Sequence, residues 1–336
     1  MPSNTNMLSP TVAILGAGSW GTAVAIHLAA SGQHVLLWAR DKQHVHDMTE
    51  GRCNQRYLPQ IQFPKTLEVS ADLTDCMRRA SHVIIAVPSH AFMPLFSTLP
   101  KPKQGLSWIT KGIDPNTHQL LSELVLKQWG TDYPIAVISG PSFAKEVARG
   151  LPTALVIASN NHDYQQTMRT LLHTNNMRVY LSDDLPGVQL CGAVKNILAI
   201  ACGISDGLQY GANAKAALIT RGLAEMRRLG LCLGARPETF MGLAGVGDLV
   251  LTCTDDQSRN RRFGIQLGQG LDPKTAEKNI GQVVEGKYNA AQICSLATEY
   301  QVDMPICHEV YTLLQGQCSP KDTVNHLMQR PSGEEF

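Results

Sequence analysis

The sequence predicts an α/β protein in which an N-terminal doubly wound (Rossmann-type) parallel sheet precedes an all-helical C-terminal domain. In the first half, short runs rich in Val, Ile and Leu alternate with helical stretches. These runs are apolar at consecutive positions, which is typical of strands buried on both faces. Beyond about residue 184 the periodic segments are helical, with few strand signals. Because 336 residues suit two domains, we predict a dinucleotide-binding domain at 1–184 and a helical substrate and dimerisation domain at 185–336.

The expected elements follow these hydrophobic runs. Strands are expected at Val12–Leu15, His34–Trp38, Val83–Val87, Leu106–Thr110, Ile135–Ile138 and Ala154–Ala158. A helix is expected at Trp20–Ala30, and Gly32 can end it. Helices of the second domain are expected at Gly187–Leu208, Ala214–Leu229, Pro237–Val250, Asn289–Tyr300 and Pro305–Leu314. The change of pattern places the boundary near Asp183–Pro186.

Composition excludes several classes of protein. With 43% apolar and 17% charged residues, the chain has the hydrophobic mass that disordered proteins lack. Its formal net charge of +1 gives no general attraction to polyanions, so no nucleic-acid partner is expected. The nine cysteines are an odd number without a C-x-x-C pair, which indicates neither a disulfide framework nor a zinc site. A reducing, cytoplasmic location fits best.

Two stretches without charged residues, 1–39 and Ser81–Pro100, are the most membrane-like parts of the chain. Glycines interrupt the first and prolines the second, and residues 1–10 lack the basic residues of a signal peptide. We therefore expect buried strands with adjoining helices there, and no integral membrane segment.

A glycine-rich turn predicts a dinucleotide site. The segment GAGSWG at residues 16–21 has the G-x-G-x-x-G spacing, after an expected strand and before an expected helix. Gly16 permits the tight turn, Gly18 lets the backbone approach a pyrophosphate, and Gly21 lets the helix pack closely on the strand. Arg40 and Asp41 follow the second expected strand. An arginine there can face the 2′-phosphate of NADP and an acidic residue can bind the ribose of NAD, so both cofactors stay open.

Lys195 is the single charged residue between Asp184 and Asp206. On a helix, its neighbours three and four positions away are all small or apolar: Cys191, Gly192, Leu198 and Ala199. Such a lysine must reach water, pair with a distant partner or lose its proton, because burial can lower a lysine pKa by about 3–5 units. A lysine with a lowered pKa could serve as a general base near neutral pH.

Other polar residues follow expected strands and turns. Lys111 and the segment Ser139–Ser142 lie at the carboxyl ends of two expected strands, where open α/β sheets bind ligands. Asp248 follows a glycine-rich turn and could pair with the isolated lysine. Arg259 and Asn260 could together bind a phosphoryl group.

Seven segments together carry a family resemblance. GAGSWGTA, TKGI, SGPSFAKE, CGAVKNILAI, GLAGVGDLVLTCT, QSRNRRFG and VVEG occur in this order between residues 16 and 286. With them the chain closely resembles the bacterial NAD(P)-dependent glycerol-3-phosphate dehydrogenases. The resemblance implies reversible reduction of a phosphorylated triose, dihydroxyacetone phosphate, to sn-glycerol 3-phosphate for glycerophospholipid synthesis. It also implies a homodimer, because members of the family are commonly dimers.

The resemblance further implies roles for individual residues. The expected catalytic residues are Lys195, Lys111 and Asp248. The expected substrate contacts are Lys111, Gly140, Ser142, Lys195, Asp248, Ser258, Arg259 and Asn260. The expected cofactor contacts are Ser19, Trp20, Arg40, Lys111, Ala144, Arg259, Val283 and Glu285. They add to the three glycines of the turn, Gly16, Gly18 and Gly21. Members vary at the position of Arg40, and many have Thr at that of Ser142, which keeps the hydroxyl.

The expected chemistry centres on the isolated lysine. In oxidation, uncharged Lys195 takes the substrate hydroxyl proton, and in reduction its ammonium polarises the ketone and returns the proton. A nearby cation, Lys111, would lower the pKa of Lys195, whereas Asp248 would raise it. The sequence leaves this balance open.

Two other functions also stay open at this stage. A β-hydroxyacid or 6-phosphogluconate-type dehydrogenase has a similar two-domain plan, and a non-catalytic NAD(P)-binding sensor would bind the cofactor without turnover. A short-chain dehydrogenase is excluded because no Tyr-x-x-x-Lys occurs. No metal site is expected, since the best cluster, His44 to Asp47, fits a helix surface.

Overall fold

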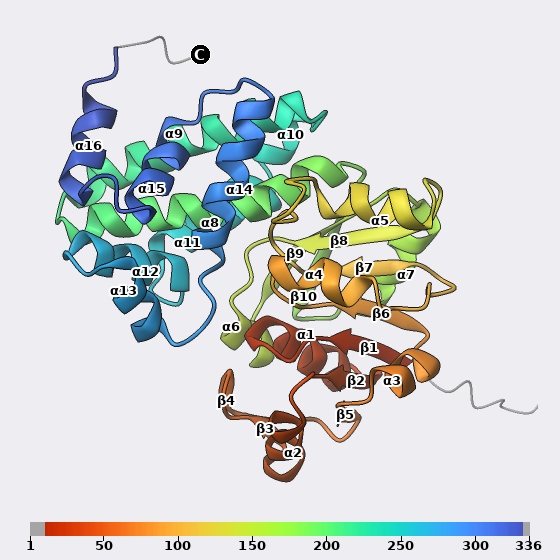
Figure 1. The fold of residues 1–336 in the computed structure, drawn as a ribbon. Helices are drawn as coiled ribbons and strands as arrows, with labels where there is room; N and C mark the ends of the chain where they lie inside the picture. The colour runs from red at the N-terminus through yellow and green to blue at the C-terminus, as the bar shows by residue number, and fades with distance from the viewer. Residues whose placement is uncertain (1–10, 332–336) are drawn as a thin grey trace, which may run out of the picture.

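The computed structural model describes residues 11–331, which form a sheet flanked by helices followed by a group of packed helices (Figure 1). The eight strands of the sheet lie in the order β10-β9-β8-β7-β6-β1-β2-β5. Their bounds are β1 Thr11–Leu15, β2 His34–Trp38, β5 Leu67–Ser70, β6 His82–Ile85, β7 Leu106–Trp108, β8 Ile135–Ser139, β9 Thr153–Ser159 and β10 Met177–Ser182. A separate hairpin joins β3, Cys53–Asn54, to β4, Leu58–Gln62.

Helices cover both faces of the sheet because its central strands are apolar at consecutive positions. Val12 and Ile14 of β1 belong to one hydrophobic cluster, and Ala13 and Leu15 belong to the cluster on the opposite face. The helices of this part are α1 Ser19–Ala30, α2 Lys42–Gly51, α3 Leu73–Arg79, α4 Ser89–Phe96, α5 Leu121–Trp129, α6 Ala144–Ala148 and α7 His162–Leu172. The predicted fold class is confirmed for this part of the chain.

The sheet departs from the predicted parallel arrangement at one junction. β8 and β9 pair antiparallel, whereas the other neighbouring strands pair parallel. A parallel connection has to cross the sheet, usually with a full helix, and the helix between these strands, α6, has five residues. The edge strands β5 and β10 were not predicted, because their sequences mix polar and apolar residues and form no continuous apolar run.

The remaining described residues are helical. Their helices are α8 Leu185–Gly207, α9 Gly211–Cys232, α10 Pro237–Phe240, the π-helical turn η1 Leu243–Gly247, α11 Asp248–Thr254, α12 Arg259–Gly268, α13 Pro273–Ile280, α14 Glu285–Glu299, α15 Pro305–Leu314 and α16 Pro320–Met328. The central helix is α8, which packs against α9, α11, α12 and α14. Glycines allow the closest of these approaches: a Cβ on Gly203 of α8 would overlap the carbonyl of Arg261, and one on Gly264 of α12 would overlap that of Ile200.

The helix predicted at Pro237–Val250 is divided into α10, η1 and α11. Within η1 the chain is kinked at Gly245, whose φ of −85° and ψ of −108° are not helical. A Cβ on Gly245 would overlap the backbone of Phe240, so the chain can fold back on itself there only with glycine. The turn makes Asp248 the first residue of α11 and buries its side chain.

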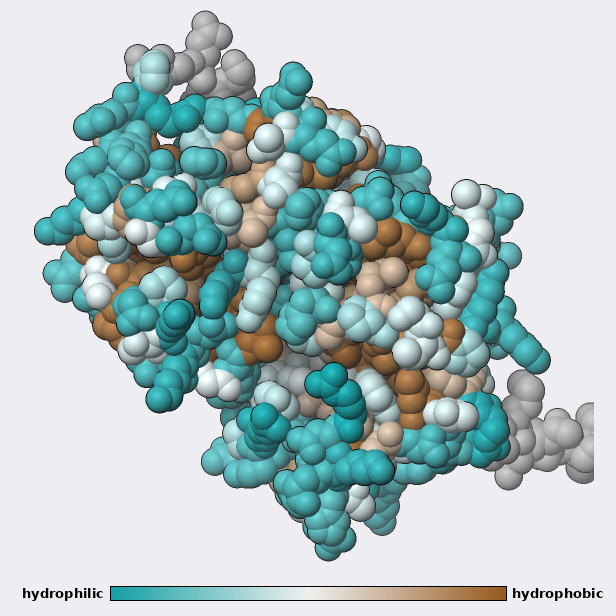
Figure 2. Space-filling view, in the orientation of Figure 1, coloured by the Kyte–Doolittle hydropathy of each residue, from teal (hydrophilic) through white to brown (hydrophobic). Residues whose placement is uncertain are grey.

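The uncharged stretches are accounted for by buried elements. Residues 11–39 form β1, α1 and β2, and Ser81–Pro100 contains β6 and α4, while residues 1–10 lie outside the described part. Within residues 11–331, α8 is long and apolar enough to cross a membrane, but its apolar window is wholly buried inside the protein. On the face shown in Figure 2, hydrophilic side chains spread over both parts and separate smaller hydrophobic areas.

Candidate active site

The glycine-rich turn connects β1 to α1 with the geometry that a dinucleotide requires. Gly16 has a φ of +130°, and a Cβ there would lie 2.6 Å from the carbonyl oxygen of Ala86. A Cβ on Gly21 would overlap the carbonyl of Gly16, so helix and strand pack closely. A Cβ on Gly18, the N-cap of α1, would meet nothing within 4 Å. The open position therefore lies at the helix N-terminus, where backbone N–H groups favour a phosphate.

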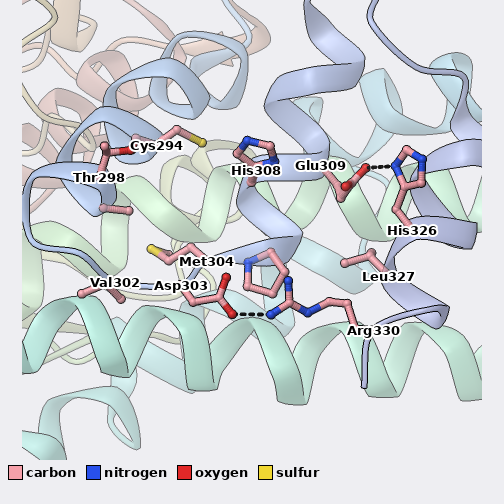
Figure 3. Close-up of a pocket in the computed structure, with 12 residues that line it drawn as sticks. Cys294, Thr298, Val302, Asp303, Met304, His308, Glu309, His326, Leu327 and Arg330 are labelled. Atoms are coloured by element: carbon pink, nitrogen blue, oxygen red, sulfur yellow. Dashed lines mark hydrogen bonds and ion pairs between the residues drawn. The ribbon is translucent and has the colours of Figure 1, made fainter. Parts of the chain in front are cut away.

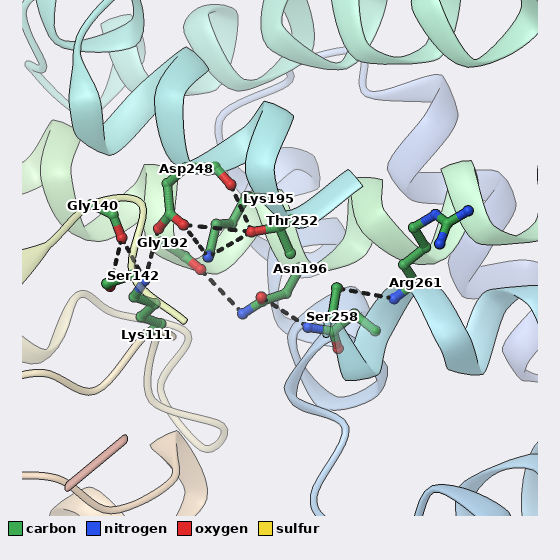
Figure 4. A network of polar contacts seen from close by, with 11 residues as sticks. Lys111, Gly140, Ser142, Gly192, Lys195, Asn196, Asp248, Thr252, Ser258 and Arg261 are labelled. Atoms are coloured by element: carbon green, nitrogen blue, oxygen red, sulfur yellow. Dashed lines mark hydrogen bonds and ion pairs between the residues drawn. The ribbon is translucent and has the colours of Figure 1, made fainter. Parts of the chain in front are cut away.

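Two lysines and one aspartate form a cluster between the two domains, in which Lys195 and Asp248 are buried and Lys111 is partly buried (Figure 4). The Lys195 ammonium donates to Asp248 Oδ1 at 2.6 Å and to the Thr252 hydroxyl at 2.9 Å. Lys111, which follows β7, donates to Asp248 Oδ2 at 2.7 Å and to the Gly140 carbonyl at 3.2 Å. The predicted pairing of Lys195 with Asp248 is confirmed, and Lys111 shares the same carboxylate.

Charge and burial set the protonation of this cluster. Burial lowers the pKa of Lys195 to about 7, opposed by Asp248 and reinforced by Lys111. Burial by itself would raise the pKa of Asp248, but the two ammonium groups outweigh it and hold that pKa below its usual value. With both lysines protonated, the cluster carries one uncompensated positive charge, which favours an anionic ligand.

The turn after β8 faces this cluster. Gly140 has a φ of +128°, which favours glycine, and its carbonyl accepts hydrogen bonds from both Lys111 and the Ser142 hydroxyl, the latter at 2.9 Å. Ala144 begins α6 directly beyond this turn. The structure therefore brings Lys111, Gly140 and Ser142 together, as the sequence predicted.

The Ser-Arg-Asn segment begins α12. The Ser258 hydroxyl caps this helix by accepting the N–H of Arg261 at 3.2 Å. The Asn260 amide donates to the Asn196 side-chain oxygen at 2.9 Å and accepts the N–H of Gly286 at 2.9 Å. Asn260 thus links α12 to α8 and to the start of α14, which leaves one N–H of its side chain for a ligand.

Arg259 and the adjacent Asn260 have different hydrogen-bonding partners. Its guanidinium donates to the Gln282 side-chain oxygen at 3.3 Å, and burial lowers its pKa while the nearby Glu285 raises it. Burial raises the pKa of Glu285 to about 7, opposed by Arg259 and by a hydrogen bond of 3.3 Å from the Ser89 hydroxyl. Val283 lies between Gln282 and Glu285 in the segment that leads into α14.

Groups of both domains meet beside the glycine turn. The Ser19 hydroxyl, at the start of α1, lies 2.9 Å from the Tyr57 carbonyl and 3.3 Å from the Gln282 side-chain oxygen. The Trp20 indole N–H is buried and has no partner within residues 11–331. The open space at Gly18 and this unpartnered donor fit a bound dinucleotide at the turn. Arg40 is exposed beyond the end of β2.

Sequence reasoning missed four residues of this region. Thr252 contacts the isolated lysine, and it lies one helical turn after Asp248, a spacing that could have revealed it. Asn196, Gln282 and Tyr57 enter the region from three separate segments. No spacing rule connects such segments before the fold is known.

Comparison with known proteins assigns the family. Residues 11–165 match the family model described as NAD-dependent glycerol-3-phosphate dehydrogenase N-terminus, and residues 184–325 match the corresponding C-terminus model. The protein belongs to the NAD-dependent glycerol-3-phosphate dehydrogenase family.

Individual family members are similar over nearly the whole chain. The glycerol-3-phosphate dehydrogenase (NAD(P)+) of Legionella pneumophila strain Corby is 66% identical over 329 residues, covering 98% of this chain and 100% of the relative. That of Thioalkalivibrio sulfidiphilus is 53% identical over 333 residues, covering 98% and 100%. The crystal structure of glycerol-3-phosphate dehydrogenase from Coxiella burnetii has a TM-score of 0.93 at 48% identity, covering 96% of this chain and 100% of that one.

A cavity of about 320 Å³ lies elsewhere in this family member, between α14, α15 and α16 (Figure 3). Its charged side chains pair with one another: His326 lies 3.1 Å from Glu309, and Arg330 contacts Asp303. None of the catalytic or binding residues predicted from the sequence lines it. We therefore assign the candidate active site to the lysine cluster and not to this cavity.

Proposed function

We propose that this protein catalyses the reversible NAD(P)H-dependent reduction of dihydroxyacetone phosphate to sn-glycerol 3-phosphate, which supplies glycerophospholipid synthesis. The observation that carries the proposal is the cluster of buried Lys195 and Asp248 with partly buried Lys111, which has one excess positive charge when both lysines are protonated. A phosphorylated triose is an anion that such a cluster attracts. The relatives named above, at up to 66% identity, support the same reaction with NAD or NADP.

Lys195 is the general acid and base of this reaction. A bound nicotinamide supplies or accepts the hydride. In oxidation, the neutral amine of Lys195 takes the proton from the C2 hydroxyl, and in reduction the ammonium polarises the C2 ketone and returns that proton. A pKa of about 7 suits both directions, because each protonation state is then well populated near neutral pH.

The two partners of Lys195 have complementary tasks. Asp248 accepts from both ammonium groups and so fixes their positions, while Lys111 adds the charge that lowers the pKa of Lys195. Lys111 also reaches the turn at Gly140 and Ser142, where substrate hydroxyl or phosphate oxygens can be bound. Further substrate contacts are proposed at the start of α12, from Ser258, Arg259 and Asn260.

The cofactor is held by residues from both domains. Its pyrophosphate lies at the glycine turn, Gly16 to Gly21, including Ser19 and Trp20. The segment Val283 to Glu285 and Arg259 bind it from the helical domain, and Lys111 and Ala144 from the sheet edge. These assignments are supported by the hydrogen bonds that join Ser19 to Gln282, before α14, and Ser89 to Glu285, the first residue of α14.

We also propose the organisation of the whole protein. The dinucleotide-binding domain spans residues 1–184 and the helical domain 185–336, in keeping with the end of β10 at Ser182 and the start of α8 at Leu185. The protein is a homodimer in the cytoplasm. Exposed Leu231 and Met241 of the helical domain support a subunit contact there, and nine unpaired cysteines support a reducing compartment.

A substrate screen that follows NADPH absorbance tests the reaction. We expect turnover with dihydroxyacetone phosphate and none with β-hydroxyacid or 6-phosphogluconate substrates. Turnover with one of these other substrates would support the rival dehydrogenase. Tight NADPH binding without turnover of any ketose phosphate would identify a cofactor sensor and refute the proposal.

A further inference from the structure

Two arginines and one aspartate lie beyond the carboxyl end of β2. Arg40 and Asp41 directly follow this strand, and Arg56 lies in the hairpin β3–β4. In sheets of this type, the residues after the second strand distinguish the 2′-hydroxyl of NAD from the 2′-phosphate of NADP. The role of Arg56 rests on the dinucleotide site described above, and it concerns which dinucleotide is preferred.

Asp41 already has one structural task. Its Oδ1 caps α2 by accepting the N–H groups of Gln43 at 3.0 Å and His44 at 3.2 Å. Its other oxygen, Oδ2, lies 3.7 Å from Arg56 Nη1. One carboxylate oxygen is therefore committed to the helix, and the other remains able to accept a ribose hydroxyl.

The Arg56 guanidinium is easily released from Asp41. Both side chains are well exposed, at 61% and 57%, and ion pairs of this kind are screened by water and contribute little. A dianionic phosphate, with several acceptor oxygens, is a stronger partner for a guanidinium than one shared carboxylate oxygen. Arg56 can thus turn from Asp41 to a phosphate at small cost.

Hydrogen bonds of the hairpin fix the position of the Arg56 backbone relative to the glycine turn. Buried Asn54 donates to the Ala17 carbonyl at 2.9 Å and to the Thr22 hydroxyl at 2.8 Å. It also accepts the Tyr57 N–H at 3.1 Å, and the Arg56 guanidinium lies 5.1 Å from the centre of the Tyr57 ring. The hairpin is therefore tied to the same turn that receives the pyrophosphate.

We infer that Arg56 determines cofactor specificity. Together with Arg40 it binds the 2′-phosphate of NADP, and when no phosphate is present Asp41 favours the free ribose of NAD. The same exposed group then serves as a partner of Asp41 when NAD is bound and of the phosphate when NADP is bound. This arrangement lets one site accept both cofactors, with a preference for NADP.

Isothermal titration with adenosine 2′,5′-bisphosphate and with ADP tests Arg56 without any turnover. Arg56→Gln is expected to weaken binding of the bisphosphate about tenfold or more, because a charge-assisted hydrogen bond is lost, and to change ADP binding by less than about twofold. Arg178→Gln is the matched control, since Arg178 is exposed on β10 at the opposite edge of the sheet. An equal loss for both ligands, or no loss for either, would overturn the inference.

Asp41→Asn provides the reciprocal test. Asparagine caps a helix as well as aspartate does, so α2 is retained, while the negative charge beside the phosphate disappears. We expect tighter binding of the bisphosphate and weaker binding of ADP, because the cap uses the single side-chain oxygen of asparagine and leaves no acceptor for the ribose hydroxyl. Weaker binding of the bisphosphate would contradict the arrangement. If the wild-type protein shows selective bisphosphate binding but no turnover of dihydroxyacetone phosphate, the proposed reaction fails and the role of Arg56 stands.

Discussion

Lys195 and Glu225 are two buried ionisable residues on the neighbouring helices α8 and α9, and their environments differ in kind. Burial brings the pKa of each to about 7, lowering that of the lysine and raising that of the glutamate. Lys195 contacts other charged side chains beside the sheet. Glu225 accepts backbone N–H groups of Ile306 at 2.7 Å and Cys307 at 3.2 Å, in the first turn of α15.

The difference shows that a displaced pKa does not by itself identify a catalytic residue. The Glu225 carboxyl group completes a helix start inside the helical domain, where its hydrogen-bonding partners are peptide groups. The Lys195 cluster has an excess positive charge when both lysines are protonated, and through Lys111 it reaches the Gly140 carbonyl of the other domain. We assign catalysis to the group whose charge is left for a ligand to balance.

Replacing the two residues tests this contrast most strongly. Lys195→Met removes the proton donor and acceptor, and we expect turnover to fall by about 10²- to 10⁴-fold. The affinity for NADPH, measured by fluorescence titration, should hardly change, because the glycine turn is untouched. Glu225→Gln should keep normal turnover. Similar turnover in the Lys195→Met and wild-type proteins would reject the assignment.

Glu225→Gln has its main effect on stability. Because the folded-state pKa of Glu225 is raised, the folded protein binds a proton more tightly than the unfolded chain, and this contribution is lost as pH rises through about 7. Between pH 4.5 and 7, the free energy of unfolding of the wild type should fall relative to Glu225→Gln by about 3 kcal/mol. Urea unfolding across this range measures the difference, and parallel pH profiles for the two proteins would refute the structural role.

Thr252 offers a smaller change within the catalytic cluster. Its hydroxyl donates to the Asp248 backbone carbonyl at 2.6 Å, which directs a lone pair toward the Lys195 ammonium. Thr252→Val should lower kcat about tenfold, corresponding to the loss of one hydrogen bond to a charged group. Thr252→Ser keeps the hydroxyl and should recover most of the activity. If valine and serine variants lose activity equally, the hydroxyl does not position the lysine.

The sequence predicted features that have a local pattern, but it did not predict features that depend on tertiary packing. Continuous apolar runs revealed the central strands, since strands buried on both faces need apolar side chains at successive positions. The glycine turn, Lys195 and Asp248 were recognisable because each has a local signature. The break at Gly245 and the antiparallel entry of β9 depend on tertiary packing, which local patterns do not encode. The contacts of Asn260 likewise depend on how three helices meet.

The pH dependence of glycerol 3-phosphate oxidation, compared between the wild type and Lys111→Met, tests the central claim most directly. In the wild type, kcat/KM should rise as pH increases through about 7, because the neutral amine of Lys195 is the base. Removal of Lys111 takes away a charge that lowers the pKa of Lys195, so the rise should move to higher pH. Titration of the substrate phosphate cannot produce such a shift, since it is the same for both proteins. A rise at the same pH in both would contradict the account.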